Sequence, residues 1–176
     1  GVIAHAAANV LNDYHDALNG ADAANSGGLF PFTGGARMIQ NGDVSVLDTR
    51  HLAQALALLV IPAGLVLAAC CGSGLIAIGA AGMLIGWAYS APPLALMARG
   101  LGETAVAAAW WLMVIGADYV ERGAFRPCSA LTAAGYALLV ANILLINGFP
   151  DAAADASVGK RTLAVKLGPA GAATLY

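Results

Sequence analysis

The sequence predicts an all-α protein, a bundle of several transmembrane helices, and two observations support this prediction. Of its 176 residues, 60% are hydrophobic and only 10% are charged, with a mean hydropathy of +0.76. Soluble globular domains rarely show such a balance. Four separate stretches are also long enough to cross the hydrocarbon core of a bilayer, which takes about 17 to 25 apolar residues. We therefore expect the chain to lie in a lipid bilayer.

The four apolar stretches are predicted to be successive membrane spans. They cover residues 51–69, 74–91, 102–118 and 129–147. The first contains Pro62, which a membrane helix tolerates because neighbouring helices can satisfy the carbonyl group that proline leaves free. The second carries Gly82 and Gly86 at a spacing that permits close approach of helices. The alternative is the buried core of a large soluble protein, which four such runs joined by short connections disfavour.

Both ends of the chain look cut within a helix. Residues 1–15 are predicted to be the end of one further helix, and residues 167–176 the start of another. Nucleic-acid binding is not expected, because a net charge of −2 and a pI near 5.8 provide no basic surface.

The connections between the predicted spans differ in their basic residues. Lysine and arginine favour cytoplasmic loops, and alternate loops share a side of the membrane. One side would hold Arg37, Arg50, Arg99, Lys160, Arg161 and Lys166. The other side would hold Arg122 and Arg126. This bias predicts that the first set faces the cytoplasm, together with the two acidic motifs described next.

The first acidic motif, NVLNDYHDALNGAD, lies at a predicted helix exit. Its amide and carboxylate residues are Asn9, Asn12, Asp13, Asp16 and Asp22. Because positions four apart share one face of a helix, we expect Asn12 and Asp16 to project together. We also expect Asn9 on the same side as Asp13 and Asp16.

The second acidic motif, NGFPDAAADASVGKRTL, repeats this spacing at the end of the fourth span. Asn147, Asp151 and Asp155 follow one another every four residues, and the basic pair Lys160 and Arg161 comes after them. Pro150 is expected to let a helix restart just before Asp151.

Carboxylates repeated on one helical face at a membrane boundary suit a hard divalent cation. Mg²⁺ takes one or two protein carboxylates and fills its other positions with water and phosphate oxygens. Two such clusters on one side of the membrane could therefore clamp a diphosphate, with a lysine and an arginine neutralising its remaining charge. A single DxxxD pair is common and could simply cap a helix or face solvent. Two Asn-xxx-Asp clusters, each ending a hydrophobic segment, form a much rarer pattern.

The two motifs resemble the signatures of the UbiA family of membrane prenyltransferases. The first resembles NDxxD, and its longer form NxxNDYxDxxxGxD is similar to the branch that prenylates 1,4-dihydroxy-2-naphthoate in menaquinone biosynthesis. The second, DxxxD followed by GKRTLAVKLG, resembles the matching signature, and YSAPPLALMARGLGE between them is similar to the family's central loop. Gly20 and Asp22 depart from the hydroxybenzoate branch and favour the naphthoate branch.

The resemblance implies roles for individual residues. Asn12, Asp16, Asp151 and Asp155 would bind Mg²⁺ and act in catalysis, with support from Asn9, Asp13, Asp22 and Asn147. The substrate diphosphate would meet Arg37, Arg99, Lys160 and Arg161. Many relatives carry basic residues after the proline pair, where this chain has Ala95 and Met97, so Arg99 is the loop's only cation. Arg37 follows Gly34 and Gly35, and this loop could lend backbone amides and a guanidinium to phosphate oxygens. The alternative is a plain turn.

Tyr89 ends the second span and has two interpretations. Its ring could face a cationic intermediate, or it could be an interfacial aromatic anchor. The resemblance implies a fragment, residues 1–176, of a single transmembrane domain that in complete form has nine helices. We also expect an integral membrane enzyme of a bacterial inner (plasma) membrane, with its active site toward the cytoplasm.

The expected reaction is transfer of a polyprenyl group from a prenyl diphosphate to an aromatic acceptor. Within the same fold the acceptor could instead be homogentisate, 4-hydroxybenzoate, haem, chlorophyllide or a lipid glycerol ether. A membrane transporter is an alternative of another class, but its ionisable groups would lie near the bilayer midplane. A third alternative is a non-catalytic membrane scaffold, but such a protein would not need the two paired acidic motifs.

Overall fold

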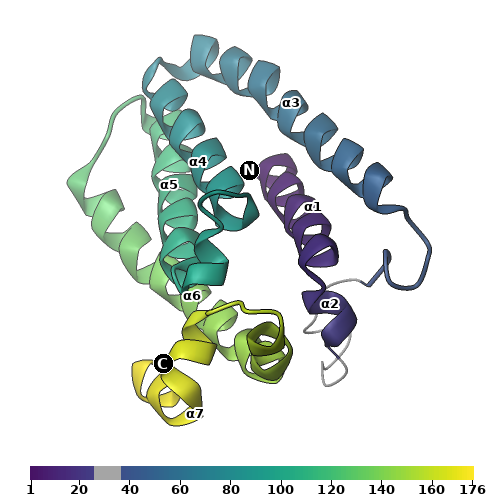
Figure 1. The fold of residues 1–176 in the computed structure, drawn as a ribbon. Helices are drawn as coiled ribbons and strands as arrows, with labels where there is room; N and C mark the ends of the chain where they lie inside the picture. The colour runs from purple at the N-terminus through teal and green to yellow at the C-terminus, as the bar shows by residue number, and fades with distance from the viewer. Residues whose placement is uncertain (26–36) are drawn as a thin grey trace.

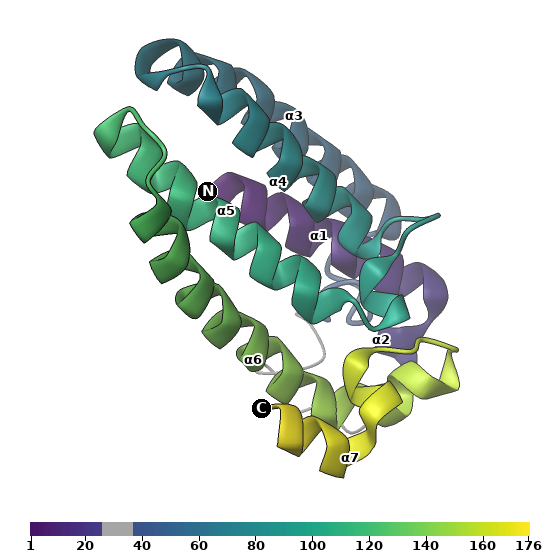
Figure 2. The same cartoon turned by 90° about the vertical axis from the view of Figure 1, so that its left-hand side faces the viewer.

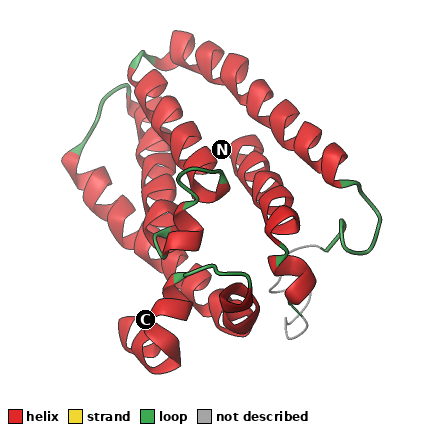
Figure 3. Cartoon of the chain, viewed as in Figure 1, coloured by secondary structure: helices red, strands yellow, loops and turns green. Residues whose placement is uncertain are grey.

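The computed structural model describes residues 1–25 and 37–176, and this part of the chain is helical with no strand. Figure 1 and Figure 3 show the helices in order. They are α1 (Val2–Asn19), α2 (Ala21–Ala24), α3 (Val46–Cys71), α4 (Gly74–Ser90), the 3₁₀-helix η1 (Leu96–Arg99), α5 (Gly102–Arg122), α6 (Pro127–Ser157) and α7 (Leu163–Leu175). The all-α prediction is confirmed, and each of the four expected spans is helical.

The long helices pack side by side and their connections gather at two ends. Helix α1 packs on α3 and α4, α4 packs on α5, and α5 packs on α6. The tight α3–α4 and α5–α6 turns lie at one end of the bundle, while α2, η1 and α7 lie at the other (Figure 2). The short helix α2 also contacts α6, which joins the start of the described chain to its last third.

Small residues form the core of the bundle and large aliphatic residues cover its outside. On α6, Ala133, Ala137 and Ala141 recur every four residues and are 0%, 2% and 7% exposed. On the same helix Leu138 and Leu139 are 62% and 66% exposed. Small residues let membrane helices approach closely, whereas an outer surface of this kind in water would be a large exposed apolar patch. The packing therefore supports a helical membrane protein.

Two helices in the described part of the chain are long and apolar enough to span a membrane by themselves, namely α3 and α6. Helices α4 and α7 are apolar but shorter. Pro62 lies inside α3 without ending it, as predicted. The expectation that a helix restarts at Pro150 is wrong, because α6 runs continuously from Pro127 to Ser157. Proline removes only its own bond to the carbonyl four residues earlier, and the flanking turns keep the helix intact.

The loop around η1 is held against the segment that follows α6, and Gly100 makes this contact possible. Arg161 N–H donates to the Ala98 carbonyl at 2.8 Å. Gly100 has φ +71°, and a Cβ there would lie 2.9 Å from the backbone oxygen of Arg161. A side chain at this position would therefore meet both backbone strain and a steric clash.

Gly100→Ala is expected to destabilise the protein more than the same change at Gly123. Gly123 also has φ +70°, but no atom of the described residues lies within 4 Å of the position that a Cβ would take there. Gly123→Ala therefore isolates the backbone strain, about 1–2 kcal/mol. The clash at Gly100 should add roughly 1–3 kcal/mol. Unfolding of both variants in detergent measures the difference, and equal losses would contradict the close loop contact.

Candidate functional site

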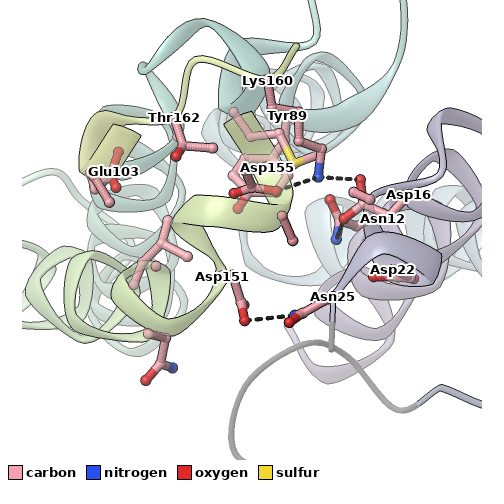
Figure 4. Close-up of a pocket in the computed structure, with 18 of the residues that line it drawn as sticks. Asn12, Asp16, Asp22, Asn25, Tyr89, Glu103, Asp151, Asp155, Lys160 and Thr162 are labelled. Carbon is pink, nitrogen blue, oxygen red and sulfur yellow. Dashed lines mark hydrogen bonds and ion pairs between the residues drawn. The ribbon is translucent and has the colours of Figure 1, made fainter. Parts of the chain in front are cut away.

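The two acidic motifs meet in a cavity of about 160 Å³ at the end of the bundle that carries α2, η1 and α7. Residues of α1, α2, α4, η1, α5, α6 and α7 line it, together with Asn25 after α2 and the segment between α6 and α7. Figure 4 shows the labelled residues of α1 and α2 facing those of α6 and the segment after it. The cavity therefore brings together residues that lie more than 100 positions apart in the sequence.

On α1, Asp16 is at the centre of a group of hydrogen bonds. Asn12 Nδ2 donates to Asp16 Oδ2 at 3.2 Å, and Asn19 Nδ2 donates to Asp16 Oδ1 at 3.2 Å. Asp16 is only 8% exposed. The predicted projection of Asn12 and Asp16 from one helical face is confirmed.

Gly20 ends α1 and directs the chain across the cavity. Its φ of +80° is left-handed, a conformation that glycine adopts without steric cost. Helix α2 follows at once, so Asp22 and Asn25 also line the cavity. Asn25 Nδ2 donates to Asp151 Oδ1 at 2.7 Å, which links the end of α2 to α6.

The continuity of α6 keeps its three polar residues on one face. Asn147, Asp151 and Asp155 all line the cavity, as their four-residue spacing predicts. The chain then turns back, and Lys160 Nζ lies 2.6 Å from Asp16 Oδ1 and 3.4 Å from Asp155 Oδ1. One buried ammonium thus contacts a carboxylate from each motif.

Two buried amide oxygens have no hydrogen-bond partner within the described ranges. They are Asn12 Oδ1 and Asn25 Oδ1, and both residues line the cavity. Buried polar atoms normally find a partner, and neutral oxygens beside carboxylates are ligands that a hard divalent cation accepts. The donor set therefore fits Mg²⁺.

The fit is to a metal ion shared with a substrate rather than to a metal held by protein alone. In residues 1–25 and 37–176, no three histidine, cysteine or acidic side chains form a ready metal cluster. Mg²⁺ commonly relies on one or two carboxylates and takes its remaining oxygens from water and substrate phosphate. The geometry therefore suits a cation that arrives with a phosphorylated ligand.

The electrostatics of the site are dominated by its carboxylates. Burial, and then the negative charges of Asp16 and Asp13, raise the pKa of Asp22 to about 6. Lys160 and a 3.1 Å hydrogen bond from Gln40 Nε2 oppose this rise. The neighbouring carboxylates thus add to the effect of burial, and a bound cation would lower the pKa of Asp22.

The structure brings together most of the predicted site residues. Those lining the cavity are Asn12, Asp13, Asp16, Asp22, Tyr89, Asn147, Asp151, Asp155 and Lys160. Asn9 is exposed instead and does not line the cavity with Asp13 and Asp16, because α1 turns its side chain outward.

The three predicted arginines do not line the cavity. Arg37 Nη1 donates to the backbone oxygens of Asp22 and Asn25 at 3.1 and 3.0 Å, so it supports the position of α2. Arg99 is exposed and donates to the Pro93 carbonyl at 2.7 Å, and Arg161 is also exposed. The Gly34–Gly35 turn lies outside the described residues.

Three further polar residues of the cavity were not predicted: Asn25, Glu103 and Thr162. Figure 4 shows Glu103 and Thr162 on the other side of Asp155 from Asp16. Glu103 could have been found, because it is the last residue of the loop motif YSAPPLALMARGLGE. Asn25 carried no such signal, since its partner Asp151 lies 126 positions away.

Comparison with known proteins gives consistent results over the whole chain. Residues 1–176 match the model of the UbiA prenyltransferase family. Three similar relatives are each named 1,4-dihydroxy-2-naphthoate octaprenyltransferase. The Bacillus subtilis protein is 30% identical, covering 96% of this chain and 53% of its own length. The Escherichia coli protein is 28% identical, covering 91% and 52%.

The third relative, from Mycobacterium tuberculosis, is 32% identical and covers 96% of this chain and 56% of its own length. The chain thus spans about half the length of the curated relatives it matches. No solved structure matches the chain significantly.

Proposed function

The chain belongs to the UbiA prenyltransferase family, and from this premise we propose that its acidic cavity binds the diphosphate of a polyprenyl donor together with Mg²⁺. The observation that supports this most is the meeting of the two motifs. Asp16 from α1 and Asp155 from α6 contact one ammonium, and Asp151 accepts a hydrogen bond from Asn25 at the end of α2. Carboxylates from both halves of the described chain thus face one space.

We propose that the acceptor is 1,4-dihydroxy-2-naphthoate, which places the reaction in menaquinone biosynthesis. Three relatives carry this substrate in their names. Gly20 and Asp22, which favoured this branch in the sequence, have structural roles at the start of α2. Other aromatic acceptors would use the same donor site, so the acceptor requires its own test.

The residues of the cavity can divide the work of the reaction. Asn12, Asp16, Asp151 and Asp155 would hold Mg²⁺, which when bound would draw charge onto the leaving diphosphate. Lys160 would contact phosphate oxygens from the same side. Tyr89 lines the cavity, where its ring could face the positive charge that develops on the allylic carbon as the diphosphate leaves. Positioning and electrostatics would then supply most of the acceleration.

We further propose that this end of the protein faces the cytoplasm. Arg99, Lys160, Arg161 and Lys166 lie on η1 or beyond α6, at the cavity end, while Arg122 and Arg126 flank the opposite α5–α6 turn. This distribution follows the preference of basic residues for cytoplasmic loops. A transporter site would instead lie near the bilayer midplane.

The decisive experiment is an assay of the purified protein in lipid with radiolabelled polyprenyl diphosphate. We expect labelled product from 1,4-dihydroxy-2-naphthoate and none from homogentisate or 4-hydroxybenzoate. In parallel, the gene should restore menaquinone to bacteria that lack their own naphthoate prenyltransferase. Product from 4-hydroxybenzoate alone would contradict the acceptor, and absence of product with every acceptor would contradict prenyl transfer.

A further inference from the structure

The lysine of the site is buried at the junction of the two acidic motifs. Lys160 is 6% exposed, and its Nζ lies 2.6 Å from Asp16 Oδ1 and 3.4 Å from Asp155 Oδ1. Figure 4 shows the ammonium between the two carboxylates. A charge this far from water requires close partners of opposite charge, and here these partners are two proposed metal ligands.

The backbone on both sides of Lys160 is anchored, so its position is part of the fold. Lys160 N–H donates to the Asp155 carbonyl at 2.9 Å, just after α6 ends. The next residue, Arg161, donates its N–H to the Ala98 carbonyl at 2.8 Å. These two bonds fix the segment between the end of α6 and the η1 loop. The side chain is therefore directed into the cavity.

The ammonium and a divalent cation would compete for the same oxygen atoms. Asp16 Oδ1 already faces Lys160 Nζ at hydrogen-bonding distance, and a metal at this oxygen would lie within a few ångströms of the ammonium. Like charges at such a distance repel strongly where water is scarce. A bound diphosphate removes this competition. Its oxygens can accept hydrogen bonds from the lysine ammonium, and the carboxylate oxygens are then free to bind the metal.

We propose that Lys160 is an exchangeable counter-ion that makes the metal and the diphosphate bind together. Without diphosphate, its ammonium neutralises Asp16 and Asp155 and keeps divalent cations bound only weakly. With diphosphate, the ammonium moves to a phosphate oxygen and the carboxylates become available to the metal. This inference rests on the proposed function, and it adds that Lys160 is the group that makes metal binding depend on diphosphate.

The test uses Mn²⁺ as a probe for the metal and inorganic diphosphate as a probe for the substrate. Mn²⁺ binding to the protein in lipid nanodiscs is followed by electron paramagnetic resonance, at matched free Mn²⁺, with and without diphosphate. The variant Lys160→Met removes the ammonium. Lys166→Met is the matched control, because Lys166 lies in the same segment but is exposed and donates to the Arg99 carbonyl instead.

We expect Lys160→Met to bind Mn²⁺ alone about tenfold more tightly than the unmodified protein, within the range of roughly 5- to 150-fold typical of coupled sites. The enhancement of Mn²⁺ binding by diphosphate should fall by a similar factor. Lys166→Met should behave like the unmodified protein. Added Mn²⁺ should also raise the melting temperature of Lys160→Met without diphosphate, because it replaces the lost charge between Asp16 and Asp155.

Failure of this inference can be told apart from failure of the proposed function. If the unmodified protein binds Mn²⁺ with diphosphate, but Lys160→Met binds Mn²⁺ alone no more tightly, the counter-ion role is overturned and the metal site stands. If no protein binds Mn²⁺ even with diphosphate, the metal–diphosphate site itself is overturned. If diphosphate does not strengthen Mn²⁺ binding to the unmodified protein, the inference is also overturned. Lys160→Gln replaces Lys160→Met in these measurements if the methionine variant does not fold.

Discussion

Asp151→Asn is expected to lower prenyl transfer by about 100-fold or more while the protein stays folded. Removing one electrostatic contact to a reacting group commonly costs about 10²–10³-fold in turnover. The asparagine oxygen can still accept the hydrogen bond from Asn25 Nδ2, so the link between α2 and α6 should survive. The change removes the negative charge of Asp151 and keeps the shape of its side chain.

Asp16→Asn should lower turnover to a similar extent, but with an additional loss of stability. Asp16 forms the shorter of the two ion pairs with Lys160, and breaking one partner of a buried pair is destabilising. The double variant should lose little more turnover than either single variant, because residues that act as a unit lose their effect together. Additive losses would contradict a shared metal–diphosphate site.

The control for both variants is Asp118→Asn at the opposite end of the bundle. Asp118 accepts from Arg122 Nε at 2.6 Å within one turn of α5, and the arginine side chain is 57% exposed. Ion pairs of this kind contribute little to stability, and none of the proposed chemistry lies there. Turnover and thermal stability measured on all of these proteins distinguish a catalytic role from a structural one, and full activity in Asp151→Asn would exclude the proposed site.

Removal of divalent metal is expected to abolish prenyl transfer and to leave the helical fold in place. The leaving diphosphate would lose its main source of charge neutralisation. The fold should persist because Lys160 already neutralises charge between α1 and the end of α6. Activity after chelation should return on adding Mg²⁺ in excess of the chelator.

Circular dichroism and turnover, measured on one chelated sample, check this expectation. Chelated Lys160→Met provides the contrast, since it lacks the internal ammonium and should melt at a lower temperature than the chelated unmodified protein. Unchanged turnover after complete chelation would contradict metal-assisted departure of the diphosphate. Loss of helical structure in the unmodified protein would contradict the stabilising role of Lys160.

Much of the site could be predicted because its pattern is local. The four-residue spacing of Asn12 and Asp16, and of Asn147, Asp151 and Asp155, determines which side chains share a helical face. The cavity is lined by all of these residues. The hydrophobic runs likewise predicted the helices, since backbone groups in lipid must be satisfied within the segment itself.

The interpretation of the basic residues shows where local pattern was insufficient. Arg99 and Arg161 were predicted to bind diphosphate, yet neither lines the cavity. Lys160 does, because the chain turns back after α6 and the backbone of Arg161 is held against Ala98. The direction of a side chain in a loop depends on such distant contacts, which sequence spacing does not encode.

The sequence by itself determined the helical class of this protein, the positions of its apolar segments and the faces on which its acids lie, because these depend on periodicities of a few residues. Only the tertiary structure decided that Asn25 reaches across to Asp151, that Lys160 joins the two motifs, and that α6 continues through Pro150. The first two features depend on contacts between segments well over 100 residues apart. There the free energy of burial and charge pairing outweighs any local preference of the chain.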